Sequence, residues 1–280
     1  MNPAHPLAKY IRPSGLKTAN CPGCGNGILS QSILRAIDEE NISIDDFVFV
    51  SGIGCAAWIP SPFFHADTLH TTHGRPIAFA TGVKLAAPDR RVMVISGDGD
   101  LLAIGGNHFI HAARRNIDMV VVCVNNYIYG MTGGQAAPTT PYGLRTETTP
   151  YGNVENSFDI SGLAIAAGAT FVARWTVYQA LQITKTLRKA LNHRGFSLIE
   201  IMSHCPVQFG RKTGSGSSTK MFESFKDDSV PAAKAAGMSS GDLEGKIVVG
   251  ELLDITKPVL DIELAALRGR LRKEAAGGEN

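Results

Sequence analysis

The chain has 280 residues, of which 44% are hydrophobic, and this is enough apolar surface for a full globular core. Its 27 basic and 25 acidic side chains leave a net charge of +2, too balanced for a surface built to coat nucleic acid or anionic lipid. We therefore expect neither nucleic acid nor a membrane as a partner. The longest apolar run is too short to cross a bilayer and the N-terminus carries no secretion signal, so we expect a cytoplasmic protein.

Apolar runs rich in Val and Ile alternate with segments of helical period along the first two thirds of the chain. We expect buried strands at residues 47–50, 91–95, 119–124, 170–173 and 196–202. We expect helices near residues 28–37, 76–86, 101–113, 160–167 and 177–191. This alternation predicts the α/β fold class, with a mostly parallel sheet and helices on both of its faces.

The last part of the chain has a different character. Residues 214–218 are rich in Gly and Ser and predict a loop, while 247–249 predict one short strand. Leucines spread among many charges over residues 260–273 predict an exposed or docking helix. We therefore divide the chain into an α/β domain over 1–205, which carries the candidate sites, and a C-terminal extension over 206–280, which packs on that domain or on a partner.

Two polar motifs follow neighbouring predicted strands. A Gly-Asp-Gly motif contains Asp98, and an Asn-Asn motif at the end of the next strand contains Asn126. Because ligands bind at the carboxyl ends of parallel strands, we expect these two side chains to face each other. Their oxygens suit Mg²⁺, and the amides of 132–135 could surround phosphate oxygens. Gly-Asp-Gly alone is usually a turn, but the two motifs together are the pattern of a thiamine diphosphate site.

The cysteines predict a second site. Cys21 and Cys24 precede the first helix, Cys55 follows the first strand and Cys205 follows the strand at 196–202, whereas Cys123 lies inside an apolar strand and is expected in the core. Four thiolates can bind zinc or a 4Fe–4S cluster. A single Cys-x-x-Cys pair with two distant cysteines, the last followed by proline, favours iron–sulfur. The alternative is a zinc-stapled interaction module without enzymatic activity.

In these motifs the sequence resembles the β subunits of 2-oxoacid:ferredoxin oxidoreductases, and among them the 2-oxoglutarate type. The resemblance covers about residues 21–205. It rests on the segments 21–25, 52–55, 70–75, 97–100, 125–135 and 205–206.

The resemblance implies specific ligands for three cofactors. Four cysteines, Cys21, Cys24, Cys55 and Cys205, would hold one 4Fe–4S cluster. Mg²⁺ would be bound by Asp98, Asn126 and the carbonyl oxygen of Ile128. The diphosphate of thiamine diphosphate would lie along Gly97, Gly99, Asp100, Thr132 and Gly133. His73 either approaches the diphosphate or is a structural histidine.

The resemblance also implies a reaction and partners. The reaction is a reversible oxidative decarboxylation of a 2-oxo acid, in which coenzyme A takes the acyl group and the cluster passes electrons to ferredoxin. The glutamate that activates thiamine has no counterpart in this chain, so an α subunit would supply it in an α2β2 heterotetramer. A simple thiamine decarboxylase is the enzymatic alternative, but it would leave the four cysteines unexplained and would need a longer chain.

Two positions bear on the substrate. Met131 stands where pyruvate-specific members have an asparagine, which favours 2-oxoglutarate and its product succinyl-CoA. Trp58 stands where some 2-oxoglutarate-using relatives have a basic residue. The distal carboxylate of the substrate would then find its cation on the α subunit, or at His65 or His70. A broader range of 2-oxo acids, including pyruvate and 2-oxobutyrate, is the alternative.

Overall fold

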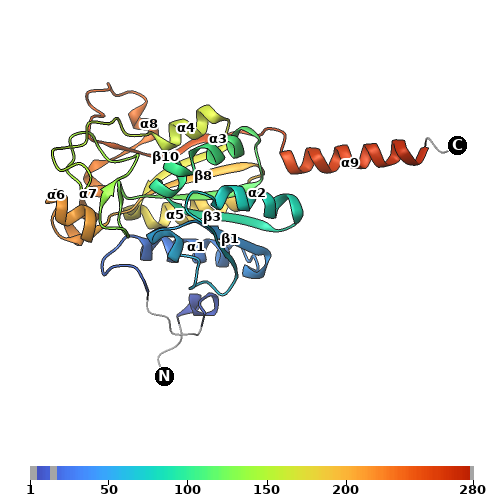
Figure 1. The fold of residues 1–280 in the computed structure, drawn as a ribbon, viewed down its shortest axis with the longest axis horizontal. Coiled ribbons are helices and arrows are strands. Elements are labelled where there is room, and N and C mark those ends of the chain that lie inside the picture. Colours follow the sequence, from blue (N-terminus) through green and yellow to red (C-terminus); the bar gives the residue numbers. More distant parts are fainter. Residues whose placement is uncertain (1–4, 13–17, 278–280) are drawn as a thin grey trace.

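The computed structural model describes residues 5–12 and 18–277. One eight-stranded sheet runs through the centre in the order β2-β1-β3-β4-β8-β7-β10-β9 (Figure 1). Its neighbouring strands pair in parallel, except that β10 runs antiparallel to β7. The mostly parallel α/β fold predicted from the sequence is therefore confirmed.

The main strands are short runs of apolar and β-branched residues. Along the sheet they are β2 (Asp67–His70), β1 (Phe47–Ser51), β3 (Arg91–Gly97), β4 (Met119–Asn125), β8 (Phe196–Met202), β7 (Phe171–Thr176), β10 (Ile247–Asp254) and β9 (Ser229–Pro231). A separate small sheet pairs β5 (Ile128–Tyr129) with β6 (Gln135–Ala136). Every residue of β4 and β8 is buried, as expected for central strands covered on both faces.

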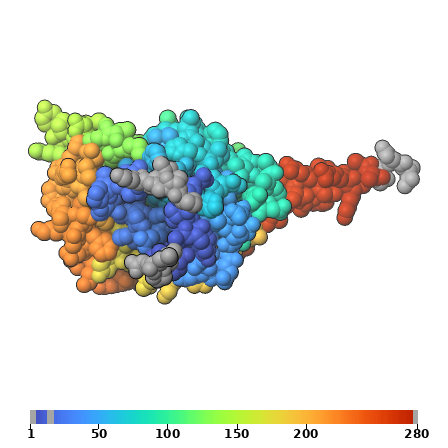
Figure 2. All heavy atoms as spheres, turned by 90° about the horizontal axis from the view of Figure 1, so that it is seen from below, coloured from blue at the N-terminus to red at the C-terminus, as the bar shows by residue number. Residues whose placement is uncertain are grey.

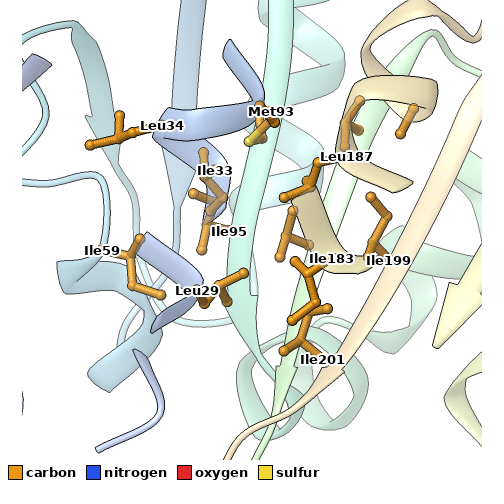
Figure 3. Close-up of a cluster of buried hydrophobic side chains, with 14 of the residues drawn as sticks. Leu29, Ile33, Leu34, Ile59, Met93, Ile95, Ile183, Leu187, Ile199 and Ile201 are labelled. Carbon is orange, nitrogen blue, oxygen red and sulfur yellow. The ribbon is translucent and has the colours of Figure 1, made fainter. Parts of the chain in front are cut away.

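Helices cover both faces of the sheet. The helices of the described chain are α1 (Asn26–Glu39), α2 (Pro76–Ala86), α3 (Gly106–Arg114), α4 (Ile160–Ala167), α5 (Ala180–Asn192), α6 (Arg211–Thr213), α7 (Ser218–Asp228), α8 (Ala232–Ala235) and α9 (Leu260–Gly277). The core forms one cluster on each face: α1 and α5 contribute to the first, and α2, α3 and α4 to the second. Successive residues of a strand point to opposite faces, so Met93 and Ile95 belong to the first cluster and Val92 and Val94 to the second. Figure 3 shows the first cluster, where Leu29 and Ile33 of α1 and Ile183 and Leu187 of α5 lie over the central strands.

Several elements differ from the expectations in detail. The helix expected at 101–113 is a wide helical turn at Gly99–Ile104 followed by α3, and the strand expected at 170–173 runs from Phe171 to Thr176. Strand β2 was not predicted, because its sequence Asp-Thr-Leu-His lacks the apolar run of a buried strand and it lies at the edge of the sheet. Its residues are exposed or half-buried.

The segment beyond residue 206 contributes to the same sheet. The short strand expected at 247–249 is the eight-residue β10, which pairs with β7 and carries β9 at the edge. The loop expected at 214–218 ends where α7 begins, at Ser218. The sheet thus continues across the proposed boundary at 205/206, which stays a prediction of the sequence.

Helix α9 projects from the body of the molecule in both views (Figures 1 and 2). Its base is anchored, because the N–H of Leu260 donates to the Asn116 carbonyl at 3.4 Å and Val259 is buried. Beyond that point, Ile262, Leu267 and Leu271 are exposed. Among residues 5–12 and 18–277, no helix is both long enough and apolar enough to span a membrane.

Candidate active site

A small cavity lies where β1, β3 and β4 end. Its volume is about 60 Å³. Most residues predicted to bind the metal and the diphosphate line it, namely Gly97, Asp98, Gly99, Asp100, Asn126, Ile128 and Thr132, together with His73 and Met131. Cys55, which the sequence assigned to a separate site, lines the same cavity. The carboxyl edge of the sheet therefore brings these side chains together.

Asp98 is the central charged group of the cavity. Its side chain is buried, and its Oδ2 accepts hydrogen bonds from the Thr139 hydroxyl and from the N–H of Tyr127 at 3.1 Å. Burial raises the pKa of Asp98 to about 6, although the hydrogen bonds from Thr139, Gly99 and Tyr127 act in the opposite direction. No cationic side chain among the described residues contributes to this pKa. A divalent cation would therefore supply the counter-charge that this carboxylate lacks.

Asn126 and Ile128 flank a tight turn beside Asp98. The N–H of Ile128 donates to Asn126 Oδ1 at 3.1 Å, which fixes the direction of the amide. Between them, Tyr127 has a φ of 64°, a left-handed conformation that is unusual for any residue other than glycine. This turn places the Asn126 side chain and Ile128 in the cavity wall with Asp98.

Asp100 lines the cavity but is already satisfied by the protein. Its Oδ1 accepts from the N–H of Gly74 at 2.6 Å and of Ile53 at 3.3 Å, and its Oδ2 accepts from the Ser96 hydroxyl at 2.6 Å. A Cβ at Gly52 would lie 1.9 Å from this carboxylate, so Gly52 leaves the room that the carboxylate fills. The predicted contact of Asp100 with a diphosphate is therefore secondary to its role in tying three loops together.

His73 adjoins Asp100. Its Nδ1 lies 3.2 Å from Asp100 Oδ1, close enough for an ion pair, but the angles do not form a hydrogen bond and Nδ1 has no other partner in the described structure. A small rotation of the imidazole would complete a hydrogen bond between the two groups. His73 therefore fits both roles considered from the sequence: it contacts Asp100, as a structural histidine would, and it also lines the cavity where the diphosphate is expected.

The turn that follows Met131 closes on itself. The Thr132 hydroxyl donates to Gln135 Oε1 at 2.7 Å, and Gln135 Nε2 donates to the Thr132 carbonyl at 2.8 Å. Gly133 and Gly134 have φ values of 116° and 95°, which favour glycine. Lys212 of α6 donates to the Gly133 carbonyl at 2.8 Å and pairs with Glu147, so the turn is fixed from outside as well. Thr132 lines the cavity, and Gly133 lies next to it in the chain.

The four predicted cluster cysteines converge on one place. A Cβ at Gly130 would lie 3.4 Å from the Sγ of Cys205 and 3.6 Å from the Sγ of Cys55, so both sulfurs adjoin the same backbone position. The loop of Cys21 and Cys24 is tied to the Cys205 segment, because the N–H of Gly25 donates to the His204 carbonyl at 3.3 Å. Cys123 is fully buried in β4, as predicted.

The thiols of this group influence one another. The pKa of Cys24 is raised to about 12, mainly by burial and in part by the charges of Cys205, Cys55 and Cys21. Burial likewise raises the pKa of Cys55 to about 11, with contributions from Cys205 and Cys21. Thiols of this kind stay protonated at neutral pH unless a metal takes up the thiolate.

The spacing of the side chains bears on the zinc alternative. Within residues 5–12 and 18–277, no three His, Cys, Asp or Glu side chains are arranged to hold a metal ion. Zinc would draw its thiolates to about 2.3 Å from one centre. A four-iron cluster is itself a body with separate corners, so its thiolates stand further apart.

The residues singled out for the substrate occupy different places. Met131 lines the cavity and is 47% exposed, so a partner molecule can reach it. Trp58 is half-buried and does not line the cavity; its ring lies edge-on to His70, with centroids 6.2 Å apart. His65 and His70 are exposed.

Sequence reasoning missed three polar residues behind the cavity: Thr139, Asn125 and Glu200. Thr139 donates to Asp98, Asn125 contacts Tyr127 and Glu200 contacts Asn125. A signal for Glu200 was present, because a carboxylate inside the apolar run 196–202 needs a buried partner. Thr139 carries no such signal, since it comes from a loop.

Comparison with known proteins agrees with this geometry. Residues 52–201 match the family model described as thiamine pyrophosphate enzyme, C-terminal TPP binding domain. The chain is 52% identical to 2-oxoglutarate synthase subunit KorB of Methanocaldococcus jannaschii over 270 residues, which cover 96% of this chain and 100% of the relative. It is 55% identical to the Archaeoglobus fulgidus KorB subunit over 71% of this chain and 74% of the relative.

A solved structure is also similar over almost the whole chain. The 2-oxoglutarate:ferredoxin oxidoreductase from Magnetococcus marinus, with 2-oxoglutarate, coenzyme A and succinyl-CoA bound, superposes with a TM-score of 0.84 and 34% identity, covering 96% of this chain and 91% of that chain. Fold, site and sequence relatives thus agree, and the chain belongs to the KorB family of 2-oxoglutarate synthase subunits, with a thiamine pyrophosphate-binding domain.

Proposed function

We propose that this chain is the β subunit of an enzyme that converts 2-oxoglutarate, coenzyme A and oxidised ferredoxin reversibly into succinyl-CoA, CO₂ and reduced ferredoxin. One observation carries the proposal: Asp98, Asn126 and Ile128, which suit Mg²⁺, and Cys55, which suits an iron–sulfur cluster, line one cavity. A thiamine site and an electron acceptor would then be direct neighbours. Neither a zinc-stapled module nor a simple decarboxylase needs this arrangement.

The residues fit a Mg²⁺–diphosphate pair. Asp98 is a buried carboxylate that no cationic side chain of residues 5–12 and 18–277 compensates, and Asn126 and Ile128 add neutral oxygens beside it. Gly97, Gly99 and Thr132 would adjoin the phosphates, where glycine lets the backbone approach closely. When bound, thiamine diphosphate supplies the means to stabilise the negative charge left by decarboxylation.

The residues likewise fit a 4Fe–4S cluster. Cys21, Cys24, Cys55 and Cys205 would be its four ligands, and Gly130 leaves the space that a side chain would otherwise take beside two of their sulfurs. The cluster would supply one-electron redox chemistry next to the thiamine site. The protein's part is to hold both groups at one edge of a rigid sheet.

The site needs a partner chain. A cavity of about 60 Å³ is far smaller than the roughly 300–1,000 Å³ of pockets that enclose small-molecule ligands, so this chain alone does not enclose a thiamine diphosphate. Asp98 and Asp100 are the only acidic residues in its described lining, and both serve other contacts, so the glutamate that activates thiamine would come from an α subunit in an α2β2 assembly. A cytoplasmic location stays a prediction of the sequence.

The preference for 2-oxoglutarate rests on Met131 and on the KorB relatives. The described cavity lining offers no Lys or Arg for a second carboxylate, so the α subunit, His65 or His70 would provide the cation. A broader 2-oxo acid specificity is the second candidate, because Met131 is an apolar contact that other side chains could share.

One experiment tests both parts of the proposal. The chain is co-expressed with its α subunit, purified without oxygen and assayed with 2-oxoglutarate, pyruvate and 2-oxobutyrate. We expect a brown complex in which this chain contributes about four iron and four sulfide, and a kcat/KM that favours 2-oxoglutarate by at least about tenfold. Stoichiometric zinc in a colourless complex would refute the enzyme, and equal kcat/KM values would leave only the broader specificity.

A further inference from the structure

Tyr127 is in direct contact with all three candidate Mg²⁺ ligands, Asp98, Asn126 and Ile128. This residue joins Asn126 to Ile128, and its N–H donates both to Asp98 Oδ2 at 3.1 Å and to Asn125 Oδ1 at 3.2 Å. Its carbonyl accepts from the Thr140 hydroxyl at 2.6 Å. Because the residue is not glycine and has a φ of 64°, these bonds must hold it in that conformation.

The side-chain amide of Asn125 accepts one hydrogen bond and donates another. Its Oδ1 faces Tyr127, and its Nδ2 donates to Glu200 Oε1 at 2.9 Å. If the amide turned over, its NH₂ group would oppose the N–H of Tyr127 and its oxygen would oppose a carboxylate. Glu200 accepts hydrogen bonds and cannot donate them while ionised, so it selects the orientation in which Asn125 accepts from Tyr127.

Glu200 is itself held firmly. It is 2% exposed, and its Oε2 accepts from the Ser161 hydroxyl at 2.7 Å and from Arg174 Nε at 2.8 Å. Arg174 pairs in turn with Asp159 at the surface. Glu200 lies on β8 and Asn125 on β4, which are neighbours in the centre of the sheet. The orientation of the turn is therefore set by the rigid interior rather than by the loop itself.

Resting on the proposed function, we propose that Asn125 and Glu200 are positioning residues for the divalent cation of the diphosphate site. They touch neither the cation nor the cofactor. They act by fixing the backbone of Tyr127, and with it the spacing of the oxygens of Asn126, Ile128 and Asp98. Mg²⁺ requires a nearly ideal octahedron, whereas the larger Ca²⁺ tolerates a looser set of oxygens.

The test uses the complete complex with the α subunit and two variants, Asn125→Ala and Glu200→Gln. Thiamine diphosphate binding is followed by calorimetry as Mg²⁺ or Ca²⁺ is titrated. For both variants we expect the half-saturating Mg²⁺ concentration to rise by about tenfold, the effect of one lost hydrogen bond to a charged or strained group. We expect the half-saturating Ca²⁺ concentration to rise less, so that the cation preference shifts toward Ca²⁺.

Asn116→Ala is the matched control. Like Asn125, Asn116 is a buried asparagine, and like Tyr127 it has a positive φ. Its side chain accepts from the Phe196 N–H and donates to the Pro258 carbonyl, at the opposite ends of the strands from the cavity. This variant should lower the melting temperature while leaving both cation titrations unchanged. It separates a loss of stability from a loss of positioning.

The outcomes divide as follows. If Glu200→Gln does not fold, Asn125→Ala decides alone, since it leaves Glu200 paired with Arg174 and Ser161. An unchanged Mg²⁺ titration, or equal losses for Mg²⁺ and Ca²⁺, overturns the positioning role and leaves the proposed function standing. If the unaltered complex binds thiamine diphosphate without any dependence on Mg²⁺, the proposed function fails first and the inference fails with it.

Discussion

At the scale of the residue, the candidate site depends on the difference between two neighbouring aspartates. Asp100 accepts from Gly74, Ile53 and Ser96, and it serves the architecture of the loops. Asp98 accepts from Thr139 and Tyr127 but has no cationic side chain beside it in the described part of the chain, and burial raises its pKa. A bound cation would therefore stabilise the carboxylate of Asp98 more than that of Asp100.

Asp98→Ala should therefore weaken the binding of thiamine diphosphate while leaving the fold intact. Without this carboxylate, we expect the affinity for thiamine diphosphate at a fixed Mg²⁺ concentration to fall by at least about tenfold, the loss of a charged ligand. Calorimetry measures the affinity, and circular dichroism measures the fold. Glu39→Gln, which changes an exposed carboxylate paired with Arg188 at the end of α1, is the control. An affinity equal to that of the unaltered protein would reduce Gly-Asp-Gly to a simple turn.

The cysteines give a second prediction. Cys205→Ser should destroy or convert the cluster, because it removes a proposed iron ligand, whereas Cys123→Ser should leave the cluster intact, because Cys123 is a core residue of β4. Iron and sulfide analysis with electron paramagnetic resonance of the reduced complex reads out both variants. Equal cluster loss in the two would contradict the ligand assignment.

At the scale of the element, the central strands and the edge on which ligands meet could be predicted from the sequence. Strands covered on both faces, such as β4 and β8, are continuous apolar runs, and residues that follow parallel strands must share one edge. Asp98 and Asn126 were brought together by this rule. The same rule explains why Cys55 lies close to Asp98 and Asn126, because Cys55 follows β1 and β1 lies beside β3.

Other features depend on contacts that no local pattern records. Strand β2 is held by pairing with β1 and not by its own composition. The contact of Asn125 with Glu200 requires the register of β4 against β8, in which Asn125 lies opposite Met202. The turn at Tyr127 has a backbone conformation that its residue type does not favour, so only its hydrogen-bond partners explain it.

Asp118, which precedes β4 at the amino ends of the strands, gives a prediction about how stability depends on pH. Asp118 is mostly buried, which by itself raises its pKa, but hydrogen bonds from Lys84, the Gly195 N–H and Arg194 outweigh burial and lower it. A lowered pKa stabilises the fold above the unfolded value of about 3.9, and this contribution is lost as pH falls through the folded value.

Asp118→Asn should accordingly change the acid response of the protein. We expect a lower melting temperature than the unaltered chain at pH 7, because Lys84 loses its buried partner. The gap should begin to narrow below about pH 4, where the unfolded chain takes up the proton, and it should close only as pH falls through the lowered pKa of the folded Asp118. Melting curves between pH 7 and pH 3 measure the difference. A gap that stays constant over this range would show that Asp118 does not titrate in the unfolding equilibrium.

At the scale of the whole molecule, the proposed function implies that this chain holds one wall of a site that an α subunit would complete. Exposed aromatic and aliphatic side chains gather on the loop between β6 and α4, among them Tyr142, Tyr151, Val154 and Phe158. The same loop is bonded to the turn beside the cavity, because the N–H of Glu147 donates to the Gly134 carbonyl at 2.9 Å. Clusters of exposed apolar side chains commonly mark protein interfaces.

The isolated chain should therefore show no turnover of 2-oxoglutarate. Adding the separately purified α subunit without oxygen should restore activity, because it would supply the activating glutamate and close the cavity. The measurement is the rate of ferredoxin reduction with each chain alone and with both. Turnover by this chain alone would refute the shared site.

Helix α9 has a consequence for solution measurements. Its 18 residues extend for about 27 Å at the usual rise of an α-helix, and most of that length has no protein around it. Since helices gain most of their stability from packing, its backbone amides should exchange hydrogen for deuterium far faster than those of α5, which lies on the sheet. The amide exchange rate of α9 therefore reports on assembly. It should be fast while the helix is exposed to solvent and should slow only when another protein surface covers the helix.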